Sequence, residues 1–321
     1  MNNNPLVSII ITTWNGEKYL IECILSLLNQ SYKNLEIILV DNASSDGSVE
    51  LVKENFPCVQ VIQNSKNLGF AEGSNIGLLR AKGELIALFN QDAVAEKKWL
   101  EKLINAIKSS DNIAAVAGKV YFYGDEHGKD AISSSWSKIN PYNGNAYNFS
   151  GDEPFSKVDC LTGCAMLVRQ KVIDEIGLLD PGYFMYFDET DWCARMIRAG
   201  YDLLYIPNAT VRHVVSASLG ESRKKSYYLS RSRIRFALKN FDMKYMPIFI
   251  LFFFMETLYI FIKNIRNLNF SDTELRLEVI IWNLLNLRKT LRARHNDLGR
   301  LHKNISYNRS LPLKKYKVGL I

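Results

Sequence analysis

The sequence predicts an α/β fold in which a mainly parallel sheet is covered by helices on both faces. Through the first 120 residues, apolar runs rich in β-branched residues alternate with runs that have helical spacing. The apolar runs are continuous, which is typical of strands that are buried on both faces. A hydrophobic content of 47% and a charged content of 23% belong to a globular chain and exclude a disordered or collagen-like one.

The alternation can be followed element by element. Strands are predicted at residues 7–12, 35–40, 59–63 and 85–89, and helices at residues 19–30, 48–56 and 72–81. Residues 121–158 are rich in Gly, Ser, Asn and Tyr and predict a long loop. A strand at 165–169, a helix at 171–176, a helix that ends before Gly200 and a strand at 211–215 complete this part.

Charge divides the chain into two predicted parts. Residues 1–222 contain 19 Lys and Arg against 27 Asp and Glu, a net charge of −8. Residues 223–321 contain 21 Lys and Arg against 6 Asp and Glu, a net charge of +15. We therefore expect an acidic globular domain at 1–222, followed by a basic, amphipathic helical tail at 223–321.

The N-terminus and the cysteines predict a protein of the reducing cytoplasm. The first fifteen residues contain no Lys or Arg, and their apolar run at residues 6–11 is too short for a secretory signal. The five cysteines are an odd number in a chain without an export signal. Free thiols are therefore expected rather than disulfides.

Polar side chains follow the predicted strands where each strand ends. Thr12, Trp14 and Asn15 follow the first strand, Asp41 the second, and the sequence Asn90–Gln91–Asp92 the fourth. In parallel sheets, the loops at the carboxyl ends of the strands converge on a ligand-binding crevice. Asp92 suits Mg²⁺ or Mn²⁺, which take oxygen ligands and phosphate, although an acidic turn can also be simply solvated.

Three carboxylates crowd into four positions at the start of a predicted helix. Asp188, Glu189 and Asp191 lie among aromatic residues in the sequence YFMYFDETDW. Helix capping and the helix dipole account for one or two acids there. Mutual repulsion and partial burial raise a carboxyl pKa towards the range of a general base, which is the alternative. His213, on an alternating strand, is either a structural histidine or a ligand of a divalent ion.

In order, these pieces resemble a family-2 glycosyltransferase of the GT-A fold. The opening VSIIITTWNGEKYLIECILSLLNQSYKNLEIILVDNASSDGS resembles that family's opening almost position by position. NLGFAEGSNIG, LFNQDA, GCAMLVRQ, FMYFDETDWCARMIRAGYDL and VRHVVSAS follow in the family's order over residues 5–240. The most similar subgroup is the rhamnosyltransferase-like enzymes of bacterial surface polysaccharide synthesis. The resemblance implies a nucleotide-sugar half at about 1–120 and an acceptor half at about 121–222.

The resemblance also implies a nucleotide-sugar pocket. Thr12, Trp14 and Asp41 lie where the family binds nucleobase and ribose, and Glu17, Asn67 and Asn75 lie in motifs that line the same pocket. To this set we add the neighbouring residues Asn15, Gly69, Asn90 and Gln91. The Gly-rich stretch that contains Gly69 matches neither the dinucleotide fingerprint nor a P-loop.

The implied chemistry is an inverting single displacement. Glu189 falls at the position of the family's catalytic base, where Asp is commoner, with Asp188 before it and Asp191 as the second candidate. Asp92 matches the last Asp of the family's D-x-D metal motif, and His213 matches the metal-site histidine. Asn90 replaces the first Asp of that motif, which resembles the N-P-D form of the rhamnosyltransferase-like subgroup. The expected cofactor is Mg²⁺ or Mn²⁺.

The basic tail predicts attachment to a membrane surface. Residues 245–262 carry a single charge, Glu256, and are bounded by Lys and Arg. Such a segment fits an anionic cytoplasmic leaflet better than it fits nucleic acid, for which no binding module is present. Pro247 and Glu256 favour peripheral or monotopic attachment over a simple span. Contact between the C-terminal helices of a homodimer is the alternative.

The sequence therefore predicts a metal-dependent inverting glycosyltransferase at the cytoplasmic face of the cell membrane. It would move a sugar, rhamnose being one candidate, from a dTDP- or UDP-sugar to a glycan or lipid-linked glycan. One alternative is a sugar nucleotidyltransferase, which predicts a glycine-rich, lysine-bearing phosphate loop near the N-terminus. The sequence TTWNGEKYL lacks that loop. The other alternative is a non-catalytic relic of the fold that binds glycan or membrane.

Overall fold

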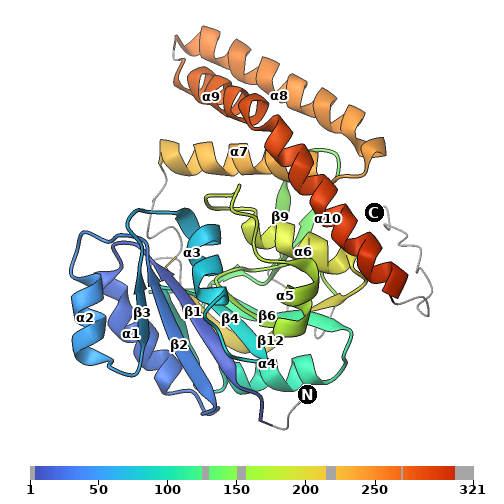
Figure 1. The fold of residues 1–321 in the computed structure, drawn as a ribbon. Helices are drawn as coiled ribbons and strands as arrows, with labels where there is room; N and C mark the ends of the chain where they lie inside the picture. Colours follow the sequence, from blue (N-terminus) through green and yellow to red (C-terminus); the bar gives the residue numbers. More distant parts are fainter. Residues whose placement is uncertain (1–3, 125–129, 150–156, 215–221, 269, 308–321) are drawn as a thin grey trace.

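The computed structural model describes residues 4–124, 130–149, 157–214, 222–268 and 270–307. Their core is a sheet of nine strands in the order β3-β2-β1-β4-β11-β6-β12-β5, with β7 paired to β6. The strands are β1 (Val7–Thr13), β2 (Leu35–Asp41), β3 (Gln60–Gln63), β4 (Leu85–Asn90), β5 (Ala93–Ala95), β6 (Ile113–Phe122), β7 (Ile132–Ser134), β11 (Ala165–Arg169) and β12 (Asp202–His213). This confirms the predicted α/β class (Figure 1).

The first four strands in the order are parallel, and antiparallel pairs occur only beyond them among the described residues. In β1, Val7 pairs with Leu35 of β2 and with Leu85 of β4, so that all three strands end at the same edge. Strand β11 runs antiparallel to both β4 and β6, and β5 runs antiparallel to β12. The carboxyl ends of β1, β2 and β4 therefore converge, as the sequence pattern predicts.

Helices cover both faces of the sheet. Because successive strand side chains point to opposite faces, Ile9 and Ile11 pack on one side while Ile10 packs on the other. The first face is covered by α1 (Glu17–Leu28) and α4 (Trp99–Lys108), and the second by α3 (Gly69–Leu78), α5 (Gln170–Ile176) and α6 (Asp188–Arg198). Helix α2 (Ser48–Asn55) lies beside α1. Burial on both faces explains why the strands are continuously apolar.

The predicted loop at 121–158 was wrong for the part that the structure describes. It contains the end of β6, strand β7, and the hairpin of β8 (Trp136–Ile139) and β9 (Ala146–Phe149), which forms a small sheet with β10 (Cys160–Leu161). These strands are only two to four residues long and are separated by stretches rich in Gly, Ser and Asn, so the sequence between residues 121 and 158 has turn-like composition. The strand predicted at 211–215 is the end of the longer β12, and residue 215 lies outside the described residues.

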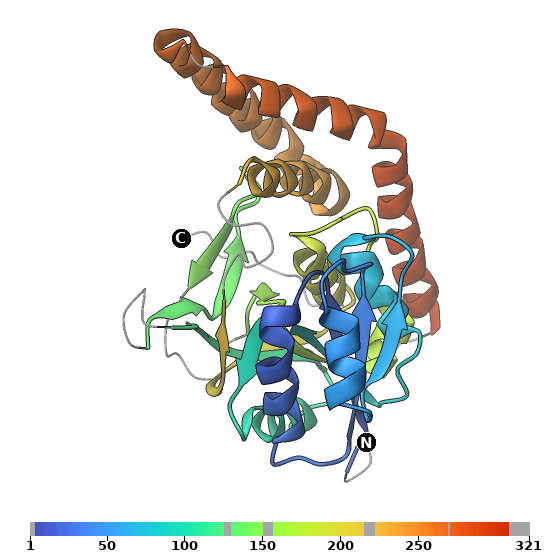
Figure 2. The ribbon, with the colours of Figure 1, turned by 90° about the vertical axis from the view of Figure 1, so that its left-hand side faces the viewer.

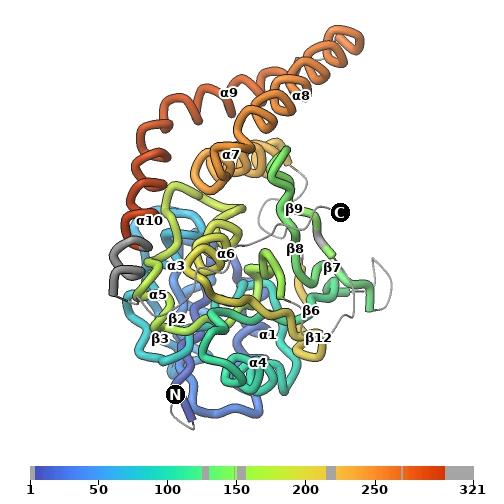
Figure 3. The backbone as a smooth tube through the Cα atoms, turned by 90° about the vertical axis from the view of Figure 1, so that its right-hand side faces the viewer, coloured from blue at the N-terminus to red at the C-terminus, as the bar shows by residue number. Residues whose placement is uncertain are grey.

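The C-terminal helices fold back over the α/β body. Helix α7 (Arg223–Asn240) lies across it, α8 (Met246–Asn267) and α9 (Ser271–Leu285) project as a pair, and α10 (Leu287–Tyr307) returns along α5 (Figures 2 and 3). A 3₁₀ turn at Met243–Tyr245 precedes α8. Tyr183 and Phe187 of the body share a buried cluster with Phe236 and Phe249 of these helices. The tail predicted from residue 223 thus packs on the body through a common core.

One helix in the described part of the chain is long and apolar enough to cross a membrane. The most apolar 18-residue window of Met243–Asn267 has a mean hydropathy of 1.9, and 11% of that window is buried. Its outward side chains are large and apolar: Ile250, Leu251, Phe252, Phe254, Met255, Tyr259 and Ile265 are each about half exposed or more. Water is a poor solvent for such a surface, which marks it as an interaction surface.

Candidate active site

A cavity of about 1210 Å³ lies between the carboxyl ends of the strands and the C-terminal helices. Ten residues of the predicted site line it: Thr12, Trp14, Asn67, Gly69, Asn90, Gln91, Asp92, Asp188, Glu189 and His213. They come from the loops after β1 and β4, the start of α3, the start of α6 and the end of β12. The fold therefore brings together residues that are up to two hundred positions apart in the sequence.

Gln91 fixes the loop that follows β1. Its Oε1 accepts a hydrogen bond from Thr13 Oγ1 at 2.6 Å and another from the backbone N–H of Trp14 at 2.9 Å. Trp14 itself is 36% exposed and lines the cavity. An aromatic face held in this way at a strand end is suited to stacking against a planar base.

The start of α3 requires a glycine. Gly69 has φ +82°, and a Cβ built on it would lie 2.2 Å from the carbonyl oxygen of Phe184. That same oxygen accepts a hydrogen bond from the backbone N–H of Phe70 at 2.7 Å. Asn67 Oδ1 accepts from the N–H of Gly69 at 2.9 Å and closes the turn. Gly69 therefore lets the backbone of α3 meet the loop that leads into α6.

Four residues of the predicted pocket do not line the cavity. Three of them accept hydrogen bonds from backbone N–H groups of the loop after β2: Asn15 from Ser45, Glu17 from Gly47, and Asp41 from Ser44. Asn75 donates to the carbonyl of Leu179 at 2.9 Å and accepts from its N–H at 3.0 Å. In this structure these four side chains hold the loops that form the pocket.

Asp92, His213 and Asn90 gather at one point of the cavity. Asp92 Oδ1 lies 3.1 Å from His213 Nε2, and Asn90 Nδ2 lies 3.2 Å from the same nitrogen. Two adjacent ligands of an octahedral ion, each about 2.1 Å from the metal, are about 3.0 Å apart. The spacing therefore fits a shared divalent ion. The described residues contain no group of three His, Cys, Asp or Glu that could hold a metal, so water or a bound phosphate would complete the ligands.

At the first turn of α6 the carboxyl of Asp188 is buried and that of Glu189 is half-buried against the cavity. Burial raises the pKa of Glu189, and burial together with the neighbouring Glu189 raises the pKa of Asp188 well above its ordinary value. One oxygen of Asp188 has no hydrogen-bond partner. Tyr186 and Phe187, directly before the helix, both have φ of 64°. Left-handed backbone at two non-glycine residues is unfavourable and is typical of functional sites.

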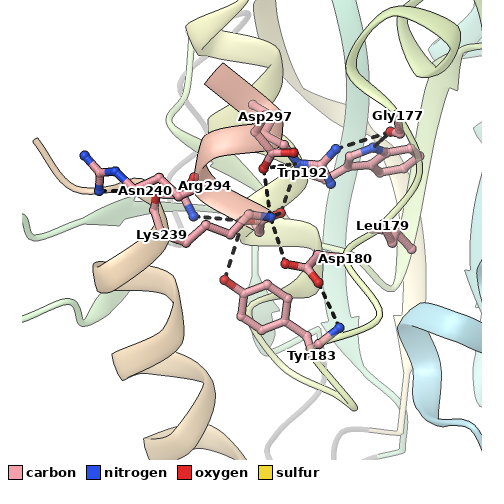
Figure 4. Close-up of polar contacts among 12 residues, drawn as sticks. Gly177, Leu179, Asp180, Tyr183, Trp192, Lys239, Asn240, Arg294 and Asp297 are labelled. Atoms are coloured by element: carbon pink, nitrogen blue, oxygen red, sulfur yellow. Dashed lines mark hydrogen bonds and ion pairs between the residues drawn. The ribbon is translucent and has the colours of Figure 1, made fainter. Parts of the chain in front are cut away.

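Asp191 does not reach the cavity and instead lies in a buried ion-pair network, in which Figure 4 labels Lys239, Asp180 and Asp297. Its carboxylate lies 2.8 Å from Lys239 Nζ and 3.0 Å from Arg195 Nε. It also accepts a hydrogen bond from Asn240 Nδ2 at 2.8 Å. Burial would raise the pKa of Asp191, but the charges of Lys239 and Arg195 hold that pKa well below its ordinary range. A carboxylate so fully engaged is a poor proton acceptor.

Two further carboxylates complete this network. Asp180 lies 2.8 Å from Arg235 Nη2 and 2.9 Å from Lys239 Nζ, and Asp297 of α10 lies 3.0 Å from the same lysine nitrogen. Lys239 is 2% exposed, so its charge is compensated by these carboxylates rather than by water. The network joins the helix that carries Glu189 to both α7 and α10.

The sequence did not predict the upper wall of the cavity. This wall is formed by Arg223, Lys224, Lys225, Tyr227, Tyr228 and Leu229 of α7 and by Glu278, Ile281, Trp282 and Leu285 of α9. Thr162, Gly163 and Cys164, between β10 and β11, add to its side. Burial, followed by the charges of Asp92 and Glu189, raises the pKa of the Cys164 thiol, which makes it a weak nucleophile. The aromatic pair at 227–228 within a basic helix is the signal that could have indicated the wall.

The sheet is mainly parallel, and a cavity at the carboxyl ends of its strands is lined by the acidic turn at Asp92 and by the carboxyls of Asp188 and Glu189. This arrangement is typical of GT-A glycosyltransferases. The model of glycosyl transferase family 2 matches residues 8–177, about half of the chain. The chain belongs to this family.

Similar proteins agree with this assignment. An uncharacterized glycosyltransferase of Haemophilus influenzae is 37% identical over 119 residues, which are 36% of this chain and 37% of that protein. The N-acetylglucosaminyl-diphospho-decaprenol L-rhamnosyltransferase of Mycobacterium tuberculosis is 24% identical over 67% of this chain and 78% of its own length. The chain thus spans less than half the length of the first of these relatives.

The fold is also that of a solved enzyme. The crystal structure of GalNAc-T7 with UDP, GalNAc and Mn²⁺ superposes with a TM-score of 0.62 at 18% identity, over 78% of this chain and 50% of that chain. At this identity the likeness shows the GT-A fold alone.

The network predicts that Asp191→Asn destabilises the fold. Removing one partner leaves buried cations uncompensated, which costs about 3–5 kcal/mol. The low pKa of Asp191 gives stability that is present above the ordinary carboxyl value of about 3.9 and is lost as the pH falls through the lower native value. In urea unfolding, the free energy of unfolding of the variant should therefore lie below that of wild type by a constant amount between pH 7 and pH 5. Below about pH 4 this difference in free energy should become smaller.

The matched control is Asp130→Asn, which removes the exposed pair with Arg212. Its effect should stay within about 1 kcal/mol. A similarly small effect of Asp191→Asn at pH 7 would show that the network does not hold the helices together.

Proposed function

We propose that this glycosyltransferase is a metal-dependent inverting enzyme that transfers a sugar from a nucleoside diphosphate to a hydroxyl group. One observation carries the proposal: two functional pairs lie in the same cavity. The first is Asp188 and Glu189, whose carboxyl pKa values are raised, and the second is Asp92 and His213, whose spacing fits a divalent ion. The family assignment favours this function over a sugar nucleotidyltransferase.

Glu189 is the proposed general base. It lines the cavity, and burial raises its pKa towards the range in which a carboxylate accepts a proton effectively at neutral pH. Burial and the neighbouring Glu189 raise the pKa of Asp188 well above its ordinary value, which favours Glu189 over Asp188 as the base. Asp191, the second candidate from the sequence, is proposed as a positioning residue that holds the first turn of α6 through Lys239.

The proposed step is a single displacement. The acceptor oxygen gives its proton to Glu189 and forms a bond to the anomeric carbon, while the bond from that carbon to the diphosphate oxygen breaks. The nucleoside diphosphate leaves with the electron pair, and no covalent enzyme intermediate is formed. The buried, protonated thiol of Cys164 is consistent with such a direct displacement.

Asp92 and His213, with Asn90 beside them, are the proposed holders of Mg²⁺ or Mn²⁺. When bound there, the ion would neutralise the charge that develops on the departing diphosphate. The donor set supports this assignment, because such ions take one or two protein carboxylates and complete their shell with substrate phosphate. Mn²⁺ in the similar structure of GalNAc-T7 also supports it.

For the donor and the acceptor we propose chemical classes rather than single compounds. A dTDP- or UDP-sugar fits the pocket beside Trp14, and rhamnose is one candidate because of the rhamnosyltransferase of Mycobacterium tuberculosis among the relatives. The acceptor is a glycan, either free or lipid-linked.

Attachment to an anionic membrane surface is proposed for the C-terminal helices. The exposed apolar side chains of α8 and the charge of +15 over residues 223–321 support it. Glu256 on α8 lies 2.8 Å from Arg276 of α9 and also pairs with Arg233 of α7. These pairs hold α8 to α7 and α9, which favours a helix lying on the surface over one that spans it.

Glu189→Gln should abolish transfer without harming the fold. Loss of a general base lowers kcat by about 10²–10⁴-fold. Because the raised pKa of Glu189 makes its ionised form a cost to the native state at neutral pH, the amide should leave the melting temperature unchanged or higher. Steady-state assays with thermal unfolding measure both, and Glu54→Gln, at an exposed position on α2, is the control. Retention of full activity would rule out Glu189 as the base.

Nucleotide binding should depend on the metal through Asp92. Calorimetric titration of UDP, dTDP and GDP with and without Mn²⁺ should show one nucleotide bound in a Mn²⁺-dependent way. Asp92→Asn should weaken that binding at least about tenfold and leave the metal-free signal unchanged. The exposed Asp272→Asn serves as control. Binding of the nucleotide that is equally tight with chelator present would contradict the metal assignment.

Membrane binding should depend on the exposed face of α8. The full chain should float with vesicles that contain anionic lipid, and less so at high salt. Leu251→Ser with Phe254→Ser should lower the bound fraction at least about tenfold, because each side chain contributes about 1.5–3 kcal/mol on burial. Ile21→Ser with Leu25→Ser changes an exposed apolar pair one helical turn apart on α1 and should have no effect. Equal losses in both double variants would argue against attachment through α8.

A further inference from the structure

We propose that the hairpin of β8 and β9 carries a second glycan-binding site, outside the cavity, which holds neutral sugar units by stacking them on the rings of Tyr147 and Phe149. The site rests on the proposed function in one respect, because a glycan acceptor longer than one sugar would extend beyond the cavity. Its ligand is recognised by the shape and charge of the hairpin, independently of catalysis.

Four side chains project from one face of the hairpin. Trp136 of β8 lies directly opposite Phe149 of β9, and Lys138 lies opposite Tyr147. Residues two apart in a strand point to the same face, and residues directly opposite each other in an antiparallel pair share that face. We call these four residues the aromatic plate.

The aromatic plate has a fixed shape. The rings of Trp136 and Phe149 stack with their centres 4.4 Å apart and their planes 9° from parallel. Lys138 Nζ lies 5.8 Å from the centre of the Trp136 ring and 5.9 Å from that of Phe149. Trp136 also packs on the buried core behind the hairpin, so it holds the Phe149 ring in place. A ring that is already held loses little entropy when a ligand stacks on it.

The outer rings of the plate are open to solvent. Phe149 is 39% exposed and Tyr147 is 48% exposed. In the described part of residues 4–222, the other aromatic side chains this exposed are Trp14, which lines the cavity, and Tyr123, whose hydroxyl is bonded to Glu22. Two exposed rings side by side on a short strand are an apolar surface that water solvates poorly, which indicates a ligand.

Both ends of the hairpin are anchored beside the cavity. Leu161 of β10 pairs with Trp136, and the next residue, Thr162, lines the cavity. At the turn of the hairpin, Arg233 of α7 donates a hydrogen bond to Asn145 Oδ1 at 2.8 Å, and Figure 3 shows β9 beside α7. The plate therefore borders the cavity on a firm support, and a glycan that leaves the cavity past Thr162 would pass over it.

The chemistry of the plate fits a sugar ring. One side of a pyranose presents C–H groups, which are weakly positive and pack on the negative face of an aromatic ring. The hydroxyl groups of the sugar need hydrogen-bond partners at the edge of that ring. Lys138 can donate there, and the hydroxyl of Tyr147 can donate or accept. Aromatic surface with a few polar groups is typical of sites that bind small ligands.

Charge and size favour a glycan over nucleic acid or protein. Lys138 is the only cation of the four plate residues, and its charge opposes the rise that burial causes in the pKa of Asp159. Residues 1–222 carry a net charge of −8, whereas a nucleic-acid backbone needs a positive groove beside the aromatic rings. A stable protein interface uses about 20–30 residues a side, far more than the plate offers.

Binding to a glycan array tests the plate without relying on catalysis. The full chain is applied, with EDTA and without nucleotide, to an array of neutral and anionic bacterial oligosaccharides of increasing length. At least one neutral oligosaccharide should be bound, and calorimetry with that compound then gives its affinity. Failure to bind any neutral oligosaccharide, or binding to anionic ones alone, would overturn the proposal.

Variants locate the bound oligosaccharide. Tyr147→Ser with Phe149→Ser should weaken its binding at least about tenfold, because two stacking contacts are lost. Tyr147→Ser alone leaves the stack of Trp136 on Phe149 in place and should weaken binding about threefold, whereas Tyr147→Phe should retain most of it. The matched control is Tyr123→Ser, at an aromatic position that is also 39% exposed, which should bind as wild type. Loss of binding in Asp92→Asn, with full binding in the double variant, would place the oligosaccharide in the cavity and overturn the proposal.

The outcome is distinguishable from failure of the proposed function. Oligosaccharide binding that depends on the plate, in a chain that transfers no sugar, would support the plate and reject the enzyme. Transfer that depends on Glu189, in a chain whose glycan binding is unchanged by Tyr147→Ser with Phe149→Ser, would support the enzyme and reject the plate.

Discussion

The structure depends on one buried ion pair, between Asp191 of α6 and Lys239 of α7. Neither side chain is accessible to water, so each charge needs the other, and Asp180, Asp297 and Arg195 balance what remains. The pair lies two residues along the helix from Glu189. The helices beyond residue 222 are thereby fixed to the turn that presents the carboxyl group, and the cavity has a lower wall from the α/β body and an upper wall from these helices.

This arrangement explains why the carboxyls at the start of α6 behave differently. The cations Lys239 and Arg195 lower the pKa of Asp191. Among the described residues no cation acts in this way on Asp188 or Glu189, and burial raises the pKa of both. The three acids lie within four residues of one another in the sequence, so their separate roles come from what the fold places next to each. Helix direction decides this: the side chain of Asp191 points to α7, and that of Glu189 lines the cavity.

Much of the fold could be predicted because its strands are uninterrupted apolar runs, as in β1 and β4, and their ends are marked by polar residues. For the same reason the positions of Asp92, Trp14 and Gln91 at the cavity followed from strand ends. The role of Asp191 could not be predicted, since its partner Lys239 is 48 residues away and nothing local distinguishes it from Glu189. The upper wall was missed because the helical spacing of Ile281 and Leu285 indicates an amphipathic helix but does not say what its apolar side faces.

The same ion pairs impose an order on folding during synthesis. Asp180 and Asp191 emerge from the ribosome well before Lys239, and α10 follows later still. At about 5–20 residues per second, the hundred residues between Asp191 and Asp297 take roughly 5–20 s to be made. Until Lys239 is made, about halfway through that interval, Asp191 has Arg195 but lacks its second cation, and Asp180 lacks the charge of Lys239. The native packing of the body is completed only when the C-terminal helices have been made. A chain that ends within α7 before Lys239 would therefore lack the cation that Asp191 and Asp180 share.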